Sequence, residues 1–272
     1  MAGRGQTARV PSAPSVFARI VCGVDETPAS LDAVRQAARL RAPDGTLHLL
    51  GAVYLAGAVA AGWSATRIAA ELEREGAEAL GRAAELSGTS ATKRLVNGPA
   101  VQCLLAELKR EHATLVAVGT HGLSRPAAIF LGGVATTMLH EAPCSVLIAR
   151  PCPEPQVFPR SLVAGVDGSA ESMLAATVAL ELRDRFGASL RALVATGGKP
   201  VDVDGLAESG LELEWEERKP AEALAAASED AELLVLGTRG LHGLRALGSV
   251  SERVAHHARC SVLVVRSQPA SE

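Results

Sequence analysis

Leu115–Leu123 reads L-V-A-V-G-T-H-G-L, and Leu233–Leu241, 118 residues later, reads L-L-V-L-G-T-R-G-L. In both stretches an apolar run stops at a glycine, and a second glycine follows three positions further on. Short, unbroken apolar runs of this kind are typical of strands buried in a parallel sheet. Their recurrence in the same form indicates that the chain contains a repeated unit.

Two further pairs of segments extend the repeat in both directions. Ile20–Asp25 (I-V-C-G-V-D) matches Leu162–Asp167 (L-V-A-G-V-D) at an offset of 142 residues. Ala142–Arg150 (A-P-C-S-V-L-I-A-R) matches Ala258–Arg266 (A-R-C-S-V-L-V-V-R) at an offset of 116 residues. Because the order is kept while the offset shrinks, the second repeat has lost 24 residues before its glycine loop and two more around that loop. The chain is therefore one domain written twice in tandem.

The repeat divides the chain into four segments. Residues 1–15 contain arginines but no apolar segment of the kind a signal peptide needs, so we expect a disordered leader. Residues 16–150 form the first domain and residues 160–268 the second. Four prolines within residues 150–159 predict a stiff, extended linker over 151–159.

Each repeat alternates strands and helices. In the first repeat we expect strands at 19–24, 46–54, 92–96, 115–118 and 144–149, and helices at 27–41, 66–86, 99–111 and 133–140. The second repeat follows the same path without its middle helix, whose place is taken by a loop, Thr196–Gly210, with four glycines. Apolar strands between helices predict a parallel sheet covered on both faces. The fold class is thus α/β, with two tandem five-stranded, doubly wound sheets and a ligand crevice beyond the carboxyl ends of the strands.

The glycine loops carry the strongest chemical signal. In the first repeat, Gly119-Thr-His-Gly122 is followed by nine residues and then Gly132-Gly133. In the second repeat, Gly237-Thr-Arg-Gly240 is followed by seven residues and then Gly248-Ser249. Glycine lets backbone N–H groups approach a ligand, and a helix that begins there offers unpaired N–H groups to a phosphate. Each repeat is therefore predicted to hold a phosphate-binding loop.

With these loops in place, the chain resembles the universal stress protein family, whose nucleotide motif is G-x2-G-x9-G-(S/T) after the fourth strand. Asp25 and Asp167 at the ends of the first strands match the family as well, as do V-N-G-P-A at Val96–Ala100 and the C-S-V-L near the end of each repeat. The resemblance covers nearly all of 16–150 and 160–268. It implies the strand order 3-2-1-4-5, pairing of the two domains through their fifth strands, and a nucleotide, usually ATP, across the ends of the first and fourth strands.

The resemblance also implies roles for single residues. Asp25 and Asp167 would lie at the adenosine end, the first two loop glycines along the ribose and phosphates, and the residues that begin the next helix at the terminal phosphates. The expected nucleotide-binding residues are Asp25, Gly119, His121, Gly122, Gly132, Gly133 and Val134 in the first repeat, and Asp167, Gly237, Arg239, Gly240, Gly248, Ser249, Val250 and Ser251 in the second. The implied ligand is ATP, or AMP or ADP, with Mg²⁺ as a companion ion.

The two repeats depart from the family motif in opposite ways. The first has the nine-residue spacing but continues as Gly133-Val-Ala135, so both hydroxyl side chains are missing. The second keeps Ser249 and Ser251 but has the shorter loop, and its Glu217-Arg-Lys-Pro220 lacks the glycine found at Gly98. We therefore expect two unequal sites.

Each of these features also has a purely structural interpretation. Asp25 and Asp167 could cap the first helix of each repeat, beside Thr27 and Ser169. Ser249 begins an S-x-x-E capping box that stabilises a helix without any ligand. The glycines could serve tight turns, and Arg125, Arg239 and Arg245 could be solvated rather than phosphate-bound.

Composition limits the function classes. The net charge is -3, which gives no basic footprint for nucleic acid. Thr46–Thr66 is nearly uncharged, but the second repeat has an ordinary strand at the same place, so we expect no membrane span. His256 and His257 are adjacent and do not face one site on a helix, so no metal site is predicted. Five cysteines without a C-x-x-C pair favour a reducing compartment, and we expect the cytoplasm.

Three functions are compatible with the sequence. The first is a stress-response regulatory module that binds an adenine nucleotide. The second is an enzyme on a related scaffold, such as an ATP pyrophosphatase, but it would need S-G-G-x-D-S after the first strand, where Asp25-Glu-Thr-Pro stands instead. No catalytic residue is assigned, and slow ATP hydrolysis is the most that we expect. The third is a family member that binds no nucleotide and acts as an interaction protein. Whichever function holds, we expect a pseudo-dimer within one chain, or a homodimer.

Overall fold

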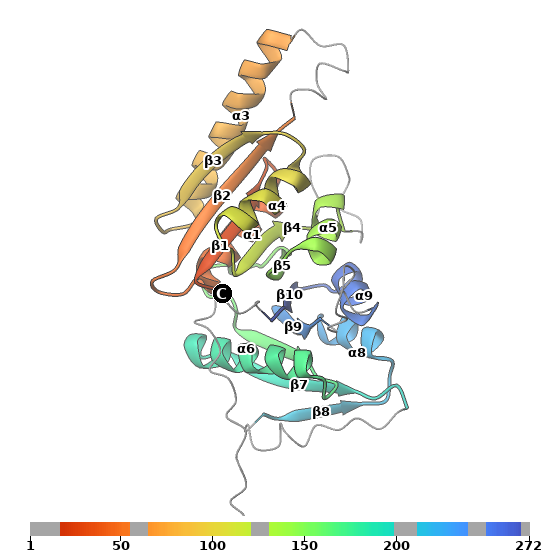
Figure 1. The fold of residues 1–272 in the computed structure, drawn as a ribbon. Coiled ribbons are helices and arrows are strands. Elements are labelled where there is room, and N and C mark those ends of the chain that lie inside the picture. Colours follow the sequence, from red (N-terminus) through yellow and green to blue (C-terminus); the bar gives the residue numbers. More distant parts are fainter. Residues whose placement is uncertain (1–16, 55–64, 121–130, 199–210, 239–248, 268–272) are drawn as a thin grey trace, which may run out of the picture.

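Ten strands form one continuous sheet in the computed structural model, which describes residues 17–54, 65–120, 131–198, 211–238 and 249–267 (Figure 1). The first repeat contributes β1 (Arg19–Val24), β2 (Thr46–Val53), β3 (Thr92–Asn97), β4 (Leu115–Gly119) and β5 (Ser145–Ala149). The second contributes β6 (Ser161–Gly165), β7 (Ser189–Ala195), β8 (Leu213–Glu216), β9 (Leu233–Gly237) and β10 (Ser261–Val265).

The strand order is β3-β2-β1-β4-β5-β10-β9-β6-β7-β8. Within each repeat this is the expected order 3-2-1-4-5 with every neighbouring pair parallel, so the α/β class and the doubly wound topology are confirmed. The two sheets are not separate, however, because β5 and β10 pair antiparallel in the middle of one mixed sheet. The fifth strands therefore join the repeats within the chain, as the family resemblance implied.

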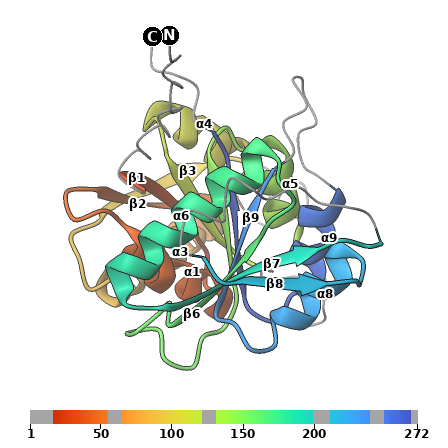
Figure 2. The same cartoon turned by 90° about the horizontal axis from the view of Figure 1, so that it is seen from below.

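Helices cover both faces of this sheet (Figures 1 and 2). One face carries α1 (Pro28–Leu40), α3 (Ala65–Leu86) and α6 (Ala170–Phe186), whose buried side chains share one apolar cluster. The other face carries α4 (Ala100–Arg110), α5 (Gly133–Glu141), α8 (Pro220–Ala227) and α9 (Ser249–His257), which share a second cluster. Successive residues of the inner strands alternate between the clusters, so these strands are largely apolar, as the sequence indicated. The edge strands β3 and β8 also carry charged residues.

The middle helix of the first repeat, α3, is longer than the sheet that it covers, and its amino-terminal half projects beyond the strands (Figure 1). Its sequence places Ile68, Leu72, Leu80, Ala83 and Leu86 near one apolar stripe, which predicts a single buried face. Leu80 and Ala83 are buried, but Ile68 and Leu72 are only partly covered and Leu86 is exposed. The stripe is therefore a core contact in its second half only. In the second repeat, residues 196–198 and 211–212 contain no helix, and the rest of the expected loop lies outside the described residues.

An arginine from each repeat caps the last helix of the other repeat. Arg150, after β5, donates to the carbonyl oxygens of Cys260 (3.2 Å) and Ala255 (2.7 Å), which lie after and within α9. Arg266, after β10, donates to the carbonyl oxygen of Leu139 in α5. Burial lowers the pKa of both guanidinium groups. These contacts add charge-assisted hydrogen bonds to the β5–β10 ladder.

The segment between the repeats has neither helix nor strand, but it is not a free spacer. Phe158 is fully buried in the cluster beneath α1 and α6. Its carbonyl oxygen accepts a hydrogen bond of 3.1 Å from Arg39 Nε on α1. The linker is therefore part of the core, which the prediction of a stiff, extended spacer did not include.

Candidate functional site

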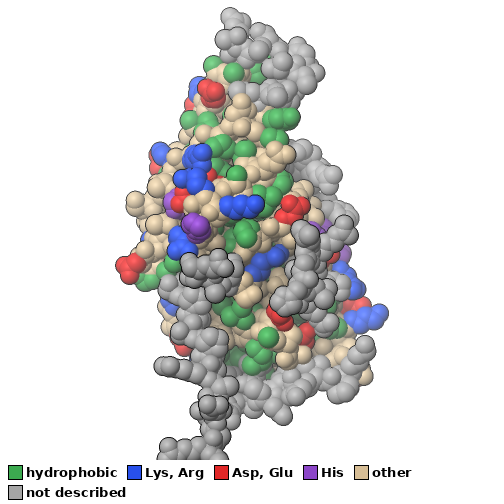
Figure 3. All heavy atoms as spheres, viewed as in Figure 1, with side chains coloured by type: hydrophobic (Ala, Val, Ile, Leu, Met, Phe, Trp, Pro, Cys, Tyr) green, Lys and Arg blue, Asp and Glu red, His purple; other side chains and the backbone are tan. Residues whose placement is uncertain are grey.

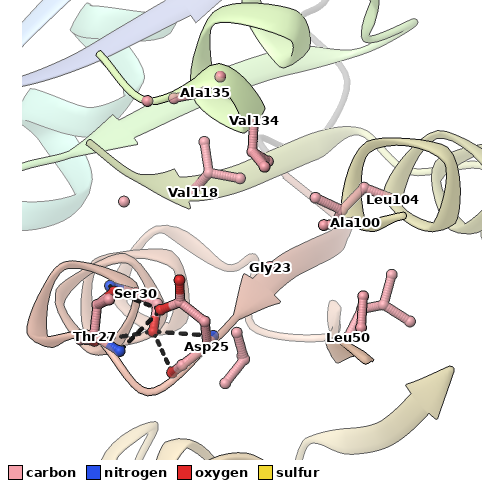
Figure 4. Close-up of a pocket in the computed structure, with 15 residues that line it drawn as sticks. Gly23, Asp25, Thr27, Ser30, Leu50, Ala100, Leu104, Val118, Val134 and Ala135 are labelled. Carbon is pink, nitrogen blue, oxygen red and sulfur yellow. Dashed lines mark hydrogen bonds between the residues drawn. The ribbon is translucent and has the colours of Figure 1, made fainter. Parts of the chain in front are cut away.

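A cavity of about 390 Å³ lies at the carboxyl ends of β1, β2 and β4 (Figure 4). This is the point where the strand order reverses, since β1 leads to β2 on one side and β4 leads to β5 on the other. We call it the first cavity. Its lining residues are Gly23, Val24, Asp25, Thr27, Ser30, Leu50, Ala52, Ala100, Leu104, Val118, Gly119, Gly132, Gly133, Val134 and Ala135.

Asp25 closes β1 through a local turn. Its Oδ1 accepts hydrogen bonds from the backbone N–H (2.9 Å) and the hydroxyl of Thr27. Thr27 in turn is the N-cap of α1, because its Oγ1 accepts from the N–H of Ser30 (3.2 Å). The cap is therefore Thr27 itself, and Asp25 holds that cap in place. No described residue donates to the second carboxylate oxygen of Asp25, and Asp25 lines the cavity.

The second wall is the start of α5. Gly132 is its N-cap without a side-chain cap, and the Gly132 N–H donates to the carbonyl oxygen of Thr120 at 2.6 Å. The N–H groups of the first helical turn, including those of Gly133, Val134 and Ala135, have no acceptor within the helix. Unpaired donors at the positive end of the helix dipole form a site for an anion. Asp25 and this helix start lie across the first cavity from each other (Figure 4).

The first loop glycine serves packing before it serves any ligand. A Cβ atom on Gly119 would lie 2.6 Å from the carbonyl carbon of Ala29, in the first turn of α1. A Cβ atom on Gly237 would lie 2.4 Å from the carbonyl oxygen of Glu171 in α6. Both glycines therefore let the first helix of each repeat approach the end of the fourth strand, a reason that the phosphate interpretation did not contain.

The second repeat has an equivalent cavity of about 230 Å³, which we call the second cavity. Its turn is the same as in the first repeat, since Asp167 Oδ1 accepts from the N–H (3.1 Å) and hydroxyl (2.5 Å) of Ser169, the N-cap of α6. Leu193, Ala195, Pro220 and Leu224 take the places of Leu50, Ala52, Ala100 and Leu104.

The hydroxyl that distinguishes the second cavity is already engaged. Ser251 is buried, and its Oγ donates to the carbonyl oxygen of Gly237 at 2.9 Å. It thus ties α9 to the end of β9. Its oxygen can still accept a hydrogen bond, but its proton is committed to the fold. In the first repeat the corresponding residue is Ala135, which has no hydroxyl.

The structure brings together part of the expected nucleotide-binding set. Asp25, Gly119, Gly132, Gly133 and Val134 line the first cavity, and Asp167, Gly237, Val250 and Ser251 line the second. Ser249 begins α9, but its side chain is not among those described. The remaining expected residues lie outside the described part of the chain: His121, Gly122, Arg239, Gly240 and Gly248.

Sequence reasoning missed the apolar walls and the serines beside the turns. Leu50 and Leu104 come from segments far apart in the chain, and only the folded sheet brings them to one cavity. Ser30 lines the first cavity, and its Oγ donates to the carbonyl oxygen of Asp25 (2.7 Å). Ser172 has the matching place in the second repeat, and this second match of D-x-x-x-x-S could have been found in the sequence.

No group of three or more His, Cys, Asp or Glu side chains is placed to hold a metal ion in the part of the chain that the structure describes. Among the same residues, no helix has both the length and the apolar character needed to cross a membrane.

Comparison with known proteins shows the family to which this chain belongs. The Universal stress protein family matches residues 17–150 and 202–266, which is more than half of the chain. The chain belongs to the universal stress protein family. A universal stress protein of Mycobacterium tuberculosis is 32% identical over 193 residues, which cover 60% of this chain and 64% of the relative. A second one from that species is 34% identical over 185 residues, covering 57% and 62%. The chain thus spans less than two thirds of the length of these relatives.

Solved structures give the same fold for the tandem arrangement. A universal stress protein from Archaeoglobus fulgidus has a TM-score of 0.71 and 20% identity, covering 93% of this chain and 97% of its own. One from Pseudomonas aeruginosa has a TM-score of 0.64 and 21% identity, covering 92% and 93%. At this identity the likeness establishes that this universal stress protein has the family fold in both of its repeats.

Proposed function

We propose that this universal stress protein is a regulatory protein that binds an adenine nucleotide in the first cavity. The observation that carries the proposal is the pairing of a carboxylate with an open helix start across one apolar-walled cavity. Asp25 offers an acceptor for a ribose hydroxyl, and the N–H groups at the start of α5 offer donors for phosphate oxygens. Leu50 and Leu104 supply apolar surface for the base.

The second cavity is proposed as the weaker site. It has the same turn and the same close helix approach, but about 230 Å³ of space against about 390 Å³ in the first. The hydroxyl of Ser251 is used within the fold. Space therefore favours the first repeat, even though the second repeat is closer to the family motif in its hydroxyl residues.

The proposed ligand is ATP, ADP or AMP, with Mg²⁺ bound through the phosphates rather than by a protein carboxylate cluster. The proposed location is the cytoplasm. All five cysteines are free thiols, and burial raises the pKa of Cys144 and Cys260 to about 12, so these thiols stay protonated and unreactive. Nucleotide occupancy would be the regulatory signal, and neither cavity holds an assigned nucleophile or base for turnover.

Asp25→Asn provides the test. We expect it to weaken ATP binding to the full chain about tenfold, because a neutral amide replaces the charged acceptor at the ribose. Asp167→Asn should change the total affinity less, and Asp44→Asn, an exposed aspartate outside both cavities, should change it by less than twofold. Equilibrium binding of labelled ATP with Mg²⁺ measures all three.

Mass spectrometry of the denatured protein as purified is the independent measurement. An adenine nucleotide released in stoichiometric amount supports the proposal. No binding at millimolar ATP, together with no released nucleotide, would reject it and leave the alternative in which the chain acts as an interaction protein without a nucleotide.

A further inference from the structure

A hollow of about 510 Å³ lies away from both cavities, at the junction of the two repeats. It is formed by the end of α1, the turn after α3, the linker and the end of α6. We call it the arginine cleft, because four of its lining residues are Arg35, Arg39, Arg41 and Arg185. None of its described lining residues is acidic.

Three of these guanidinium groups have no carboxylate partner in the described structure. Arg35 is paired with Asp32 at 2.9 Å, but Arg39, Arg41 and Arg185 contact only neutral groups. Burial and the positive charges of Arg39 and Arg41 lower the pKa of Arg185, so the three charges are close enough to repel each other. The fold thus gathers cations here without neutralising them.

A second basic region of this chain differs from the arginine cleft, because its cations have carboxylate partners. Lys, Arg and His side chains also gather over β2, β3 and α4 (Figure 3). There Glu107 pairs with Arg94 and Arg110, and Glu111 pairs with Arg110 and His48. That cluster is internally compensated, whereas the arginine cleft is not.

Each of the three arginines also has contacts within the fold, all of them to neutral groups. Arg185 donates to the carbonyl oxygens of Arg39, Leu40 and Arg41, so it caps the end of α1. Arg41 donates to the carbonyl oxygens of Pro43 (3.4 Å) and Gly45 and to Thr89 Oγ1 (2.8 Å), but its Nε is buried and has no hydrogen-bond partner among the described residues. Arg39 uses one nitrogen for Phe158 O, and its guanidinium carbon lies 5.1 Å from the ring centroid of Phe186.

We propose that the arginine cleft binds a small polyphosphate anion, a ligand with two or more linked phosphate groups, through Arg39, Arg41 and Arg185. Several cations in one hollow of this size favour an anion that carries several charges in a small volume. The planar guanidinium fork matches phosphate oxygens in geometry as well as in charge. The ligand would contact α1 of the first repeat and α6 of the second, so it would stabilise the junction of the repeats. This proposal does not depend on nucleotide binding in the first cavity.

Isothermal titration of the full chain with inorganic tripolyphosphate, in buffer without Mg²⁺, tests the proposal. We expect saturable binding, weakened about tenfold or more by Arg39→Gln and by Arg185→Gln, since each removes a charge-assisted contact. The matched control is Arg183→Gln on the same helix, whose guanidinium pairs with Asp184 at 2.8 Å outside the cleft. It should change the affinity by less than twofold. Arg39→Gln leaves the cap of α1 by Arg185 in place, so a folded variant is available if Arg185→Gln unfolds.

Three results would overturn the proposal. The first is an absence of binding up to millimolar tripolyphosphate. The second is an equal loss in Arg183→Gln and Arg39→Gln, which would show general attraction to positive charge. The third is binding that is unchanged in Arg39→Gln but lost in Asp25→Asn, which would place the phosphates in the first cavity instead.

Discussion

The first and second cavities share their scaffold and differ in what they offer a ligand. Both have an aspartate that holds an N-cap hydroxyl, and both have a glycine where a helix touches the end of the fourth strand. The first cavity is larger than the second, at about 390 Å³ against about 230 Å³. The third residue of the helix that begins at the cavity is Ser251 in the second repeat and Ala135 in the first. The features demanded by packing are thus common to both repeats, while the features that face a ligand have diverged.

The largest expected effect comes from replacing the glycine at the end of the fourth strand, which both repeats share. Gly237→Ala and Gly119→Ala should each lower the free energy of unfolding by about 3 kcal/mol, because the new Cβ atom meets helix backbone that cannot rotate away. The loss should be at least as large for Gly237, where the contact is closer. Urea unfolding of the protein without nucleotide measures it.

Gly81→Ala is the control for this pair. Gly81 lies within α3, and a Cβ atom there would meet nothing within 4 Å. This substitution should raise stability by about 1 kcal/mol, as for any glycine inside a helix that has room for a Cβ atom. If Gly119→Ala and Gly237→Ala left the stability of the ligand-free protein unchanged, both glycines would serve the ligand alone, and the shared scaffold would not exist.

The next effect compares the two capping arginines. Arg150→Met should lower the free energy of unfolding by about 2 kcal/mol, since it leaves the carbonyl oxygens of Ala255 and Cys260 without their charged donor. Arg266→Met should cost about 1 kcal/mol. Arg266 has one such carbonyl partner, and its buried Nε has none among the described residues. Equal losses in urea unfolding would show that the two halves of the junction are equivalent after all.

Much of this architecture could be predicted from sequence. The strand Arg19–Val24 was predicted with its bounds, because the five consecutive apolar or small residues after Arg19 leave few alternatives. The order of the strands needed the family resemblance, since local patterns do not specify which strands are neighbours. The volume of each cavity and the mutual capping by Arg150 and Arg266 depend on residues more than 80 positions apart, and they emerge only from packing. The hydrogen bond from Ser251 to Gly237 O spans only 14 positions, but it also depends on how α9 packs against the end of β9.

A smaller effect is expected when Ser251 and Ala135, which occupy the same position in the two repeats, are exchanged. Ser251→Ala should lower stability by about 1 kcal/mol, because the Gly237 carbonyl loses its donor. Ala135→Ser should restore the corresponding contact to Gly119 in the first repeat and raise stability by about 0.5 kcal/mol. Thermal unfolding of the two single variants and of the double exchange checks these values. A loss of ATP affinity in Ser251→Ala without any change in stability would instead assign this hydroxyl to the ligand.

The smallest effect concerns pH and only the first repeat. Hydrogen bonds and charge from Arg110, with Arg94 beside it, hold the pKa of Glu107 below its usual value. Glu107 therefore stabilises the fold above its usual pKa, and this contribution is lost as the pH falls through its lowered value. The second repeat has Ala227 at the matching position of α8.

Glu107→Gln should accordingly flatten the decline of the urea midpoint between about pH 5 and pH 3 relative to the unchanged chain. Glu85→Gln, which removes an exposed carboxylate on α3, is the control and should leave the decline unchanged. An identical decline in the Glu107 variant would show that acid acts elsewhere.

The antiparallel pairing of β5 with β10 has a consequence for how the two sites can evolve and respond. In a dimer of identical subunits the two binding sites are identical, and dilution separates the subunits. Here the pairing is unimolecular, so it forms at any protein concentration and no exchange of subunits can scramble it. The first repeat always pairs with the second repeat and never with a copy of itself. One cavity can therefore lose affinity for its ligand while its repeat keeps the strand that pairs with the other repeat. Any difference between the two repeats is therefore present in every molecule, with the two cavities in the same relative arrangement.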